Sequence, residues 1–216
     1  MNIKLWREYL ITLSFAILLA MLVRHFLLTA YKVPTGSMQP TLKPGDFIFS
    51  YRLAYKTGNK VKRGDLVTFA YPHQPDVTYV KRVIAIAGDH VRISHGHLFL
   101  NEEEATYQLV NQPEENPNPT VFDLYSEVTY EMNHLIILSK TMVEKNFGPF
   151  VVPPGEVFLL GDNRDASDDS RYWGTVPIES IQGQVSFIWL SLDWQSRWGG
   201  DRYPKVRWER VFSSVH

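Results

Sequence analysis

A serine in a turn-forming segment and a lysine in an apolar, strand-like run are the residues of this chain best suited to covalent chemistry. Ser37 lies in the stretch 34–42, where proline and glycine favour a turn whose free backbone amides could face a carbonyl oxygen. Lys81 lies in the run 79–85, in which strand alternation places it on a largely apolar face. Burial on such a face lowers the pKa of a lysine, so neutral Lys81 could accept a proton from the Ser37 hydroxyl. The two residues could therefore form a hydrolytic pair.

Each of these residues also has a plainer interpretation. Ser37 alone fits a solvent-facing turn serine, since Pro-x-Gly-Ser is an ordinary turn sequence. Lys81 alone fits a solvated lysine on a half-exposed strand, because lysines are rarely buried without a partner. Neither residue establishes an activity without the other.

A dense run of charges, Gly-Asp-Asn-Arg-Asp-Ala-Ser-Asp-Asp-Ser-Arg-Tyr-Trp-Gly, occupies residues 161–174. An acidic turn or a calcium loop would be the alternatives. However, Arg164 and Arg171 offset the carboxylates, and the glycine and glutamate positions of an EF-hand loop are missing. We interpret this segment as a rigid polar network and expect no metal there.

Three histidines form a weaker candidate for a metal site. His95 and His97 would share one face of a strand, with His90 nearby. No carboxylate partner is evident, which favours surface histidines of a hairpin over metal ligands.

Size and composition set limits on the function. The chain has 216 residues, enough for one sizeable domain, and a net charge of −1, which argues against nucleic acid as a partner. The chain has no cysteine, so disulfides, thiolate metal sites and a cysteine nucleophile are excluded.

The N-terminal segment predicts a membrane anchor. Residues 9–23 carry no charge but span only about 22 Å as a helix, whereas extension to residue 30 gives about 33 Å, enough for a hydrocarbon core of about 30 Å. A cleaved signal peptide is the competing interpretation, although a cut after Ala30 would put the bulky Leu28 where a small residue is needed. Basic residues flank the segment on both sides, so charge alone does not fix its orientation.

The remaining chain predicts a mainly antiparallel β-domain. Short apolar runs alternate with turn residues, and Gly-Asp recurs at 45–46, 64–65, 88–89 and 161–162. A proline-containing polar loop at 111–120 marks a small β-rich insertion covering about 92–150. The strands that we expect cover 46–51, 66–70, 79–87, 90–94, 97–100, 135–138, 184–192 and 206–212.

Four segments, taken in order, resemble the bacterial type I signal peptidases (leader peptidases), which are membrane-bound serine proteases with a Ser/Lys dyad. The resemblance covers most of the chain after the anchor and is carried by residues 34–42, 64–69, 79–89 and 161–177. Any one segment is modest evidence, whereas all four in this order are specific.

The resemblance implies roles for eleven residues. Ser37 would be the nucleophile and Lys81 the general base; Ser167 would orient Lys81, and Thr35 would help the Ser37 amide to bind the oxyanion. The remaining residues divide into a substrate-binding group of Val33, Pro34 and Val80 and a group of supporting ion-pair residues, Arg82, Asp162, Asp169 and Arg171.

The resemblance also implies an antiparallel β-sheet catalytic domain of the signal-peptidase kind, no metal and no other cofactor. Residues 1–8 would be cytoplasmic, 9–30 a single transmembrane helix, and 31–216 a peptidase domain on the periplasmic side of the bacterial inner membrane. The partners would be membrane lipid and secretory precursor proteins, whose signal peptides would be removed after small-x-small sequences through an acyl-enzyme.

Two rival interpretations remain at this point. A Ser/Lys autoprotease of the kind found in SOS-response repressors shares the dyad, but the chain has no helix-turn-helix segment and such a protein needs no anchor. A membrane-tethered β-domain that only binds partners would leave Ser37 and Lys81 incidental, and would function normally after Ser37→Ala.

Overall fold

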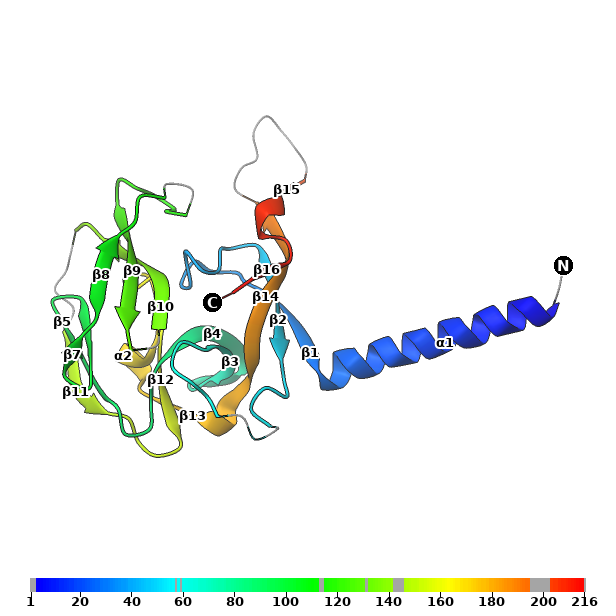
Figure 1. Ribbon diagram of the computed structural model, residues 1–216, viewed down its shortest axis with the longest axis horizontal. Coiled ribbons are helices and arrows are strands. Elements are labelled where there is room, and N and C mark those ends of the chain that lie inside the picture. The colour runs from blue at the N-terminus through cyan, green and yellow to red at the C-terminus, as the bar shows by residue number, and fades with distance from the viewer. Residues whose placement is uncertain are drawn as a thin grey trace.

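A computed structural model describes residues 3–56, 58, 60–112, 115–130, 132–141, 146–194 and 203–215. One long helix precedes a chain of short strands, and Figure 1 shows this helix extending away from a β-rich body. The α-helices are α1 (Ile3–Phe26) and α2 (Ser170–Trp173). The strands are β1 (Leu28–Lys32), β2 (Asp46–Tyr51), β3 (Leu66–Tyr71), β4 (Gln74–Ile86), β5 (His90–Ser94), β6 (His97–Leu100), β7 (Glu103–Glu104), β8 (Thr106–Leu109), β9 (Phe122–Thr129), β10 (Met132–Ser139), β11 (Phe147–Val151), β12 (Glu156–Leu160), β13 (Val176–Pro177), β14 (Ile181–Asp193), β15 (Lys205–Val206) and β16 (Ser213–Ser214).

The largest sheet carries both segments that we expected to hold the hydrolytic pair. Its strand order is β1-β2-β14-β3-β4-β12-β13, with β15 and β16 paired to β14, and the pairings are antiparallel. The prediction of a mainly antiparallel β-protein is thus confirmed.

Two smaller sheets lie between β4 and β12 in the sequence. One has the order β10-β9-β8 and the other β11-β5-β6-β7. The stretch 92–150, which we assigned to an insertion, falls within these two sheets, and Figure 1 shows them on the side of the body away from α1. Buried side chains of β5, β6 and β12 form a shared core, in which Phe158 is fully buried beside Val91 and Leu98.

The N-terminal helix differs from the predicted anchor in its limits. It covers Ile3–Phe26, and the chain then enters β1, so residues 28–30 are strand where we had expected helix. Antiparallel pairing explains the difference, since Leu28 to Ala30 lie opposite Tyr51 to Phe49 of β2. No helix in the described part of the chain has the length and apolar character needed to span a bilayer, so the expected transmembrane helix is not confirmed.

The predicted strand at 206–212 is wrong. Only residues 205–206 and 213–214 pair with β14, and a short 3₁₀ turn, Trp208–Arg210, separates them. The turn allows Arg207 and Arg210 to reach back to Asp46, where the Arg210 Nη2–Asp46 Oδ2 distance is 2.7 Å. The ion pairs that Arg207 and Arg210 make with the buried Asp46 carboxylate thus interrupt a stretch whose sequence predicts a strand.

Candidate active site

A turn anchored by buried apolar side chains positions Ser37. The turn follows β1, and the Leu42 amide donates to the Met38 carbonyl at 2.8 Å. Met38 and Leu42 are buried in a cluster that includes Val33 and Ile48. The neighbours of Ser37 thereby fix the turn, while Ser37 itself is only partly buried.

Strand β4 positions Lys81. Lys81 lies opposite Val67 of β3, and its neighbour Arg82 lies opposite Leu160 of β12, so β4 is paired on both sides here. Lys81 is only 3% exposed, and its Nζ lies 5.6 Å from the centre of the Tyr79 ring. Of the two interpretations of Lys81, the structure therefore shows the less common one, a buried lysine, and not a solvated lysine on a half-exposed strand.

Ser37 and Lys81 meet directly. Lys81 Nζ donates a hydrogen bond to Ser37 Oγ at 2.8 Å. Burial lowers the pKa of Lys81 to about 8, even though Asp169, Asp168 and Asp162 act in the opposite direction. A substantial fraction of Lys81 is therefore neutral just above neutral pH and able to accept the Ser37 proton.

The Thr35 hydroxyl lies beside the same serine. Thr35 Oγ1 is 3.5 Å from Ser37 Oγ, and Thr35 is exposed to the cavity side of the turn. A hydroxyl here could donate to an oxyanion formed on a carbonyl attacked by Ser37. The role of Thr35 stays a prediction.

Ser167 lies near the pair without contacting Lys81 through a hydrogen bond. Its Oγ is buried and has no hydrogen-bond partner among the described residues. A Cβ placed on Gly161 would collide with Ser167 Oγ and would lie 2.5 Å from the Ser37 carbonyl oxygen. Gly161 thus allows Ser167 to pack close to the Ser37 backbone, and orientation of Lys81 by Ser167 stays a prediction.

Asn163 holds the Ser37 turn and was missed by the sequence reasoning. The Asn163 amide nitrogen donates to the Ser37 carbonyl at 3.1 Å, and Asn163 Nδ2 donates to the Gly36 carbonyl at 3.1 Å. Its place beside Asp162 in the charged segment was the available signal, but no sequence pattern distinguished Asn163 from the charged residues around it.

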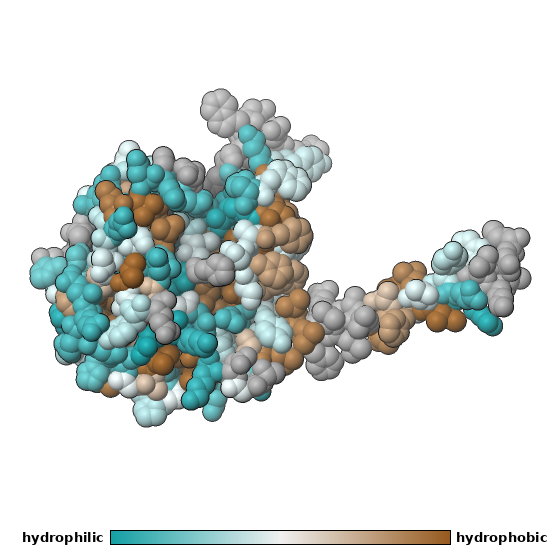
Figure 2. Space-filling view, viewed as in Figure 1, coloured by the Kyte–Doolittle hydropathy of each residue, from teal (hydrophilic) through white to brown (hydrophobic). Residues whose placement is uncertain are grey.

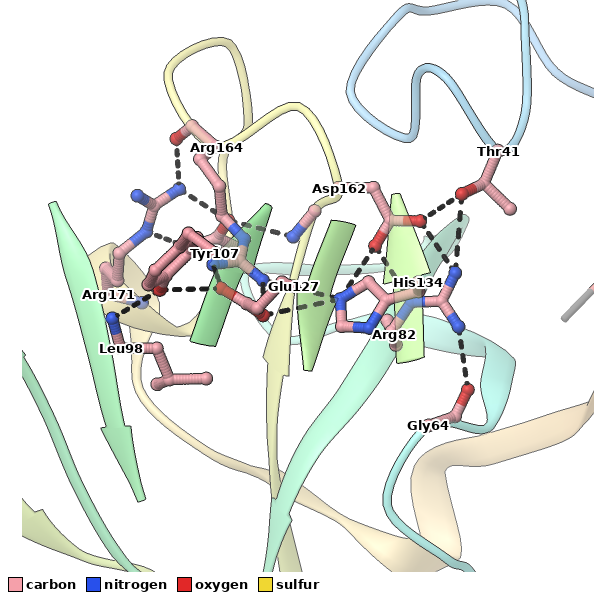
Figure 3. Close-up of polar contacts among 12 residues, drawn as sticks. Thr41, Gly64, Arg82, Leu98, Tyr107, Glu127, His134, Asp162, Arg164 and Arg171 are labelled. Carbon is pink, nitrogen blue, oxygen red and sulfur yellow. Dashed lines mark hydrogen bonds and ion pairs between the residues drawn. The ribbon is translucent and has the colours of Figure 1, made fainter. Parts of the chain in front are cut away.

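Two buried ion pairs fix the charged segment, one to strand β4 and the other within the segment. Arg82 binds Asp162 through both carboxylate oxygens, at 2.9 and 2.8 Å, and Figure 3 shows that Arg82 also reaches the Gly64 carbonyl and Thr41. Asp162 is fully buried, which alone would raise its pKa, but the Arg82 charge and hydrogen bonds hold that pKa below its ordinary value. Arg82 and Asp162 are thus paired with each other, and their support of the site stays a prediction.

The second pair joins Arg171 to Asp169, with Nε–Oδ1 and Nη2–Oδ2 distances of 2.7 and 2.8 Å. Asp169 also caps α2 and accepts a hydrogen bond from the Gly161 amide at 3.1 Å. The Asp169 carboxylate therefore fixes both ends of the segment that carries Ser167.

A further buried network, which sequence reasoning did not predict, connects the charged segment to the insertion. Arg164 binds both carboxylate oxygens of Glu127 on β9, at 2.7 and 2.5 Å, and the Tyr107 hydroxyl donates to the same carboxylate at 2.9 Å. Figure 3 shows His134 of β10 between Glu127 and Asp162, with its Nε2 3.4 and 3.9 Å from their nearest oxygens. Burial lowers the pKa of His134 to about 4, so the ring is neutral at neutral pH. The charged segment is thus part of a buried polar network, and its rigidity stays a prediction.

A cavity of about 300 Å³ adjoins the Ser37–Lys81 pair. It runs between the chain after β1 and the first half of β4, and it is lined by the predicted substrate-binding residues Val33, Pro34 and Val80. Val33 is buried in the core cluster as well, whereas Pro34 is exposed. The cavity could hold an extended peptide with its carbonyl near Ser37 Oγ.

The histidines of the insertion do not form a metal site in the described part of the chain. His97 Nδ1 contacts Glu104 Oε1 at 2.7 Å on the surface, so the carboxylate partner that the sequence did not reveal is present. Nevertheless, no group of three histidine, cysteine, aspartate or glutamate side chains among the described residues is arranged to hold a metal.

Comparison with known proteins shows strong similarity to one family. The family model described as signal peptidase, peptidase S26, matches residues 6–190. A signal peptidase I of Pseudomonas aeruginosa is 36% identical over 198 residues, which cover 80% of this chain and 68% of that protein. A signal peptidase I of Aquifex aeolicus is 32% identical over 217 residues, covering 86% of this chain and 84% of that protein. A crystal structure of a signal peptidase I from Enterococcus faecalis aligns with 58% of this chain and 97% of that chain, at 26% identity and a TM-score of 0.38.

Proposed function

Because this chain belongs to the signal peptidase family, peptidase S26, and is a serine peptidase of that family, we propose that it cuts signal peptides from exported precursors with Ser37 as nucleophile and Lys81 as general base. The observation that carries the proposal is the 2.8 Å hydrogen bond between Lys81 Nζ and Ser37 Oγ, made by a lysine that is almost completely buried. A solvated lysine would remain protonated at neutral pH and could not act as the base.

The precursor binds as an extended strand in the cavity beside Val33, Pro34 and Val80. Alternate side chains of an extended peptide point to the same side, so the first and third residues before the cut face the cavity together. The lining of the cavity would then decide which side chains fit at these two positions, and we propose that it requires small ones.

Acyl transfer then proceeds in two steps. Neutral Lys81 takes the Ser37 proton as Ser37 Oγ attacks the carbonyl carbon, and the oxyanion is held by the Ser37 amide and the Thr35 hydroxyl. The Lys81 ammonium gives its proton to the departing amine, leaving an acyl-enzyme on Ser37. Lys81 next activates a water molecule, which releases the signal peptide and restores the serine.

The surrounding residues keep this geometry. Arg82 with Asp162 and Arg171 with Asp169 support the segment next to Ser37, and Asn163 holds the turn itself. Ser167 is proposed to steady Lys81 during turnover, since its buried hydroxyl lies close to the Ser37 backbone. The proposed chemistry uses no metal or other cofactor.

We also propose that α1 anchors the protein in the bacterial inner membrane, with the peptidase domain on the periplasmic side. Large apolar side chains of α1 are exposed, among them Leu10, Ile11 and Phe15. Figure 2 shows an apolar band on the part of the body next to α1. The half-buried aromatic residues Phe47, Phe49, Phe187 and Trp189 of β2 and β14 also pack on one another. Exposed apolar surface of this extent favours lipid over water.

The side of the membrane can be tested by labelling, because the chain has no cysteine of its own. A single Glu103→Cys change puts a thiol on the exposed strand β7. A membrane-impermeant maleimide should label this thiol in intact spheroplasts. Labelling only after lysis would contradict the periplasmic placement, and complete release of the protein by alkaline carbonate would contradict the anchor.

Cleavage itself is tested with a purified secretory precursor in detergent, with the mass of each product locating the cut. The wild-type protein should cut once, after a small-x-small sequence. A precursor with leucine in place of either small residue should resist cleavage. Equal cleavage of the leucine-substituted precursors would contradict the proposed specificity.

A further inference from the structure

One carboxylate of the charged segment differs from its neighbours in its surroundings. Asp162 and Asp169 are fully buried, and each is bound by an arginine. Asp168 is exposed and forms no salt bridge with any residue in the described ranges. The arginine ion pairs therefore explain why Asp162 and Asp169 are present, but they do not explain the presence of Asp168.

Asp168 lines the cavity that contains Ser37 and Lys81. Among the described residues that line this cavity, it is the one acidic side chain, and the other charged residues there are Lys81 and Lys32. Lys32 lies over the Trp194 ring, 5.2 Å from its centre. A peptide in the cavity would thus meet one negative charge, close to the reacting groups.

Aromatic side chains lie near Asp168. Burial raises the pKa of the Tyr71 hydroxyl, and the negative charge of Asp168 raises it further. The Tyr71 ring stacks on the Tyr79 ring, with centroids 4.4 Å apart, and Lys81 Nζ lies over that same Tyr79 ring. Asp168 therefore lies at the wall of the cavity, near the Ser37–Lys81 pair.

We infer that Asp168 is a specificity-determining residue, which favours precursors with a lysine or arginine next to the small residue at the cut. This inference rests on the proposed function. The two positions concerned are the second residue before the cut and the first residue after it. They are the neighbours of the residue whose carbonyl Ser37 attacks, and in an extended peptide their side chains point away from the floor of the cavity, toward its solvent-exposed wall, where Asp168 lies. A carboxylate on a water-accessible cavity wall attracts a cationic side chain and repels an anionic one, and screening by salt weakens both effects.

The effect is a modest preference, since an exposed ion pair contributes little in water. We expect kcat/KM for a lysine-containing precursor to exceed that for the matched glutamate-containing precursor by roughly threefold to tenfold at low ionic strength. The ratio should shrink as salt is added.

The test uses the full-length protein in detergent and precursors that differ only by lysine or glutamate at one of the two positions. The Asp168→Asn variant keeps the size of the side chain and removes its charge. Asp123→Asn is the matched control, because it makes the same charge change on β9 outside the cavity. A loss of charge near Lys81 could change the overall rate, but the ratio between two precursors cut by the same enzyme cancels that change.

The inference predicts a lysine preference in the wild-type and Asp123→Asn proteins and a ratio close to one in Asp168→Asn, at one position or both. Cleavage by all three proteins with the same ratio at both positions would overturn the role of Asp168 and leave the proposed function intact. No cleavage of any precursor by any of the three would overturn the proposed function and this inference together.

Discussion

The ammonium nitrogen of Lys81 lies 2.8 Å from the hydroxyl oxygen of Ser37, although 44 positions separate the two residues in the chain. The pairing of β4 with β3 and β12 fixes the lysine, and the buried side chains of Met38 and Leu42 fix the serine turn. The contact is thus made by two independently supported segments, which is the kind of preorganisation that acyl transfer requires.

The pH dependence of cleavage should report the ionisation of Lys81. Burial lowers its pKa to about 8, against the opposing charges of Asp169, Asp168 and Asp162 and with the help of Arg171. Because the base must be neutral, kcat/KM should fall about tenfold per pH unit below this pKa and reach a plateau above it. A rate profile between pH 5 and 10 measures this, and a flat profile between pH 6 and 9 would contradict the assignment of Lys81 as the base.

The Thr35 hydroxyl should matter more to kcat than to KM. Thr35→Val keeps the shape of the side chain and removes the donor, and the loss of one oxyanion donor costs on the order of a hundredfold or more in kcat. Thr35→Ser retains a hydroxyl and should remain within about tenfold of the wild type, by the same reasoning. Steady-state kinetics with one precursor separates the constants, and equal activity of Thr35→Val and the wild type would remove Thr35 from the mechanism.

Gly161 should not tolerate a methyl group. The new Cβ would collide with Ser167 Oγ and press against the Ser37 carbonyl, so Gly161→Ala should lower kcat/KM by about tenfold or more through displacement of the nucleophile turn. Gly88→Ala is a matched control, because Gly88 has a φ of 89° but no atom within 4 Å of its would-be Cβ. Gly88→Ala should therefore reduce stability, by about 1 kcal/mol or more, with normal activity. Equal kcat/KM in both variants would show that the close approach at Gly161 has no functional effect.

Neutralising Asp162 should destabilise the fold strongly. Asp162→Asn leaves the Arg82 guanidinium buried without its counter-charge, which should lower the free energy of unfolding by about 3–5 kcal/mol. Replacing both residues, as Arg82→Met with Asp162→Leu, removes the unpaired charge and should cost less than the single change. Urea unfolding of the three proteins compares them, and a single variant as stable as the wild type would contradict the structural role of this pair.

The sequence identified those features that depend on local pattern. Alternation and turn residues were enough to predict the strands at 46–51, 90–94 and 97–100, each with the limits that the structure gives. Three of the four Gly-Asp pairs are turns with a left-handed glycine, at Gly45, Gly64 and Gly88. The fourth glycine, Gly161, is required by a close approach of chain segments, which no local pattern reveals.

The buried polar network could not be predicted, because its members come from segments that meet only in the folded chain. Glu127 and His134 lie on β9 and β10 of the insertion, whereas Arg164 lies in the charged segment. Charged residues in strands normally indicate a solvated face, and only the tertiary structure shows that these are desolvated in a mutually bonded group. Asn163 could not be predicted for the same reason, because its role depends on hydrogen bonds to two backbone carbonyls of the Ser37 turn.

The most direct test of the Ser37–Lys81 assignment is cleavage of one secretory precursor by the wild type, Ser37→Ala and Lys81→Met, with circular dichroism showing that all three are folded. Methionine matches the length and apolar stem of lysine and removes only the titrating amine. The wild type should make one cut, and neither variant should give any product. Continued cleavage by folded Lys81→Met would show that another residue is the base, and cleavage by Ser37→Ala would show that Ser37 is not the nucleophile.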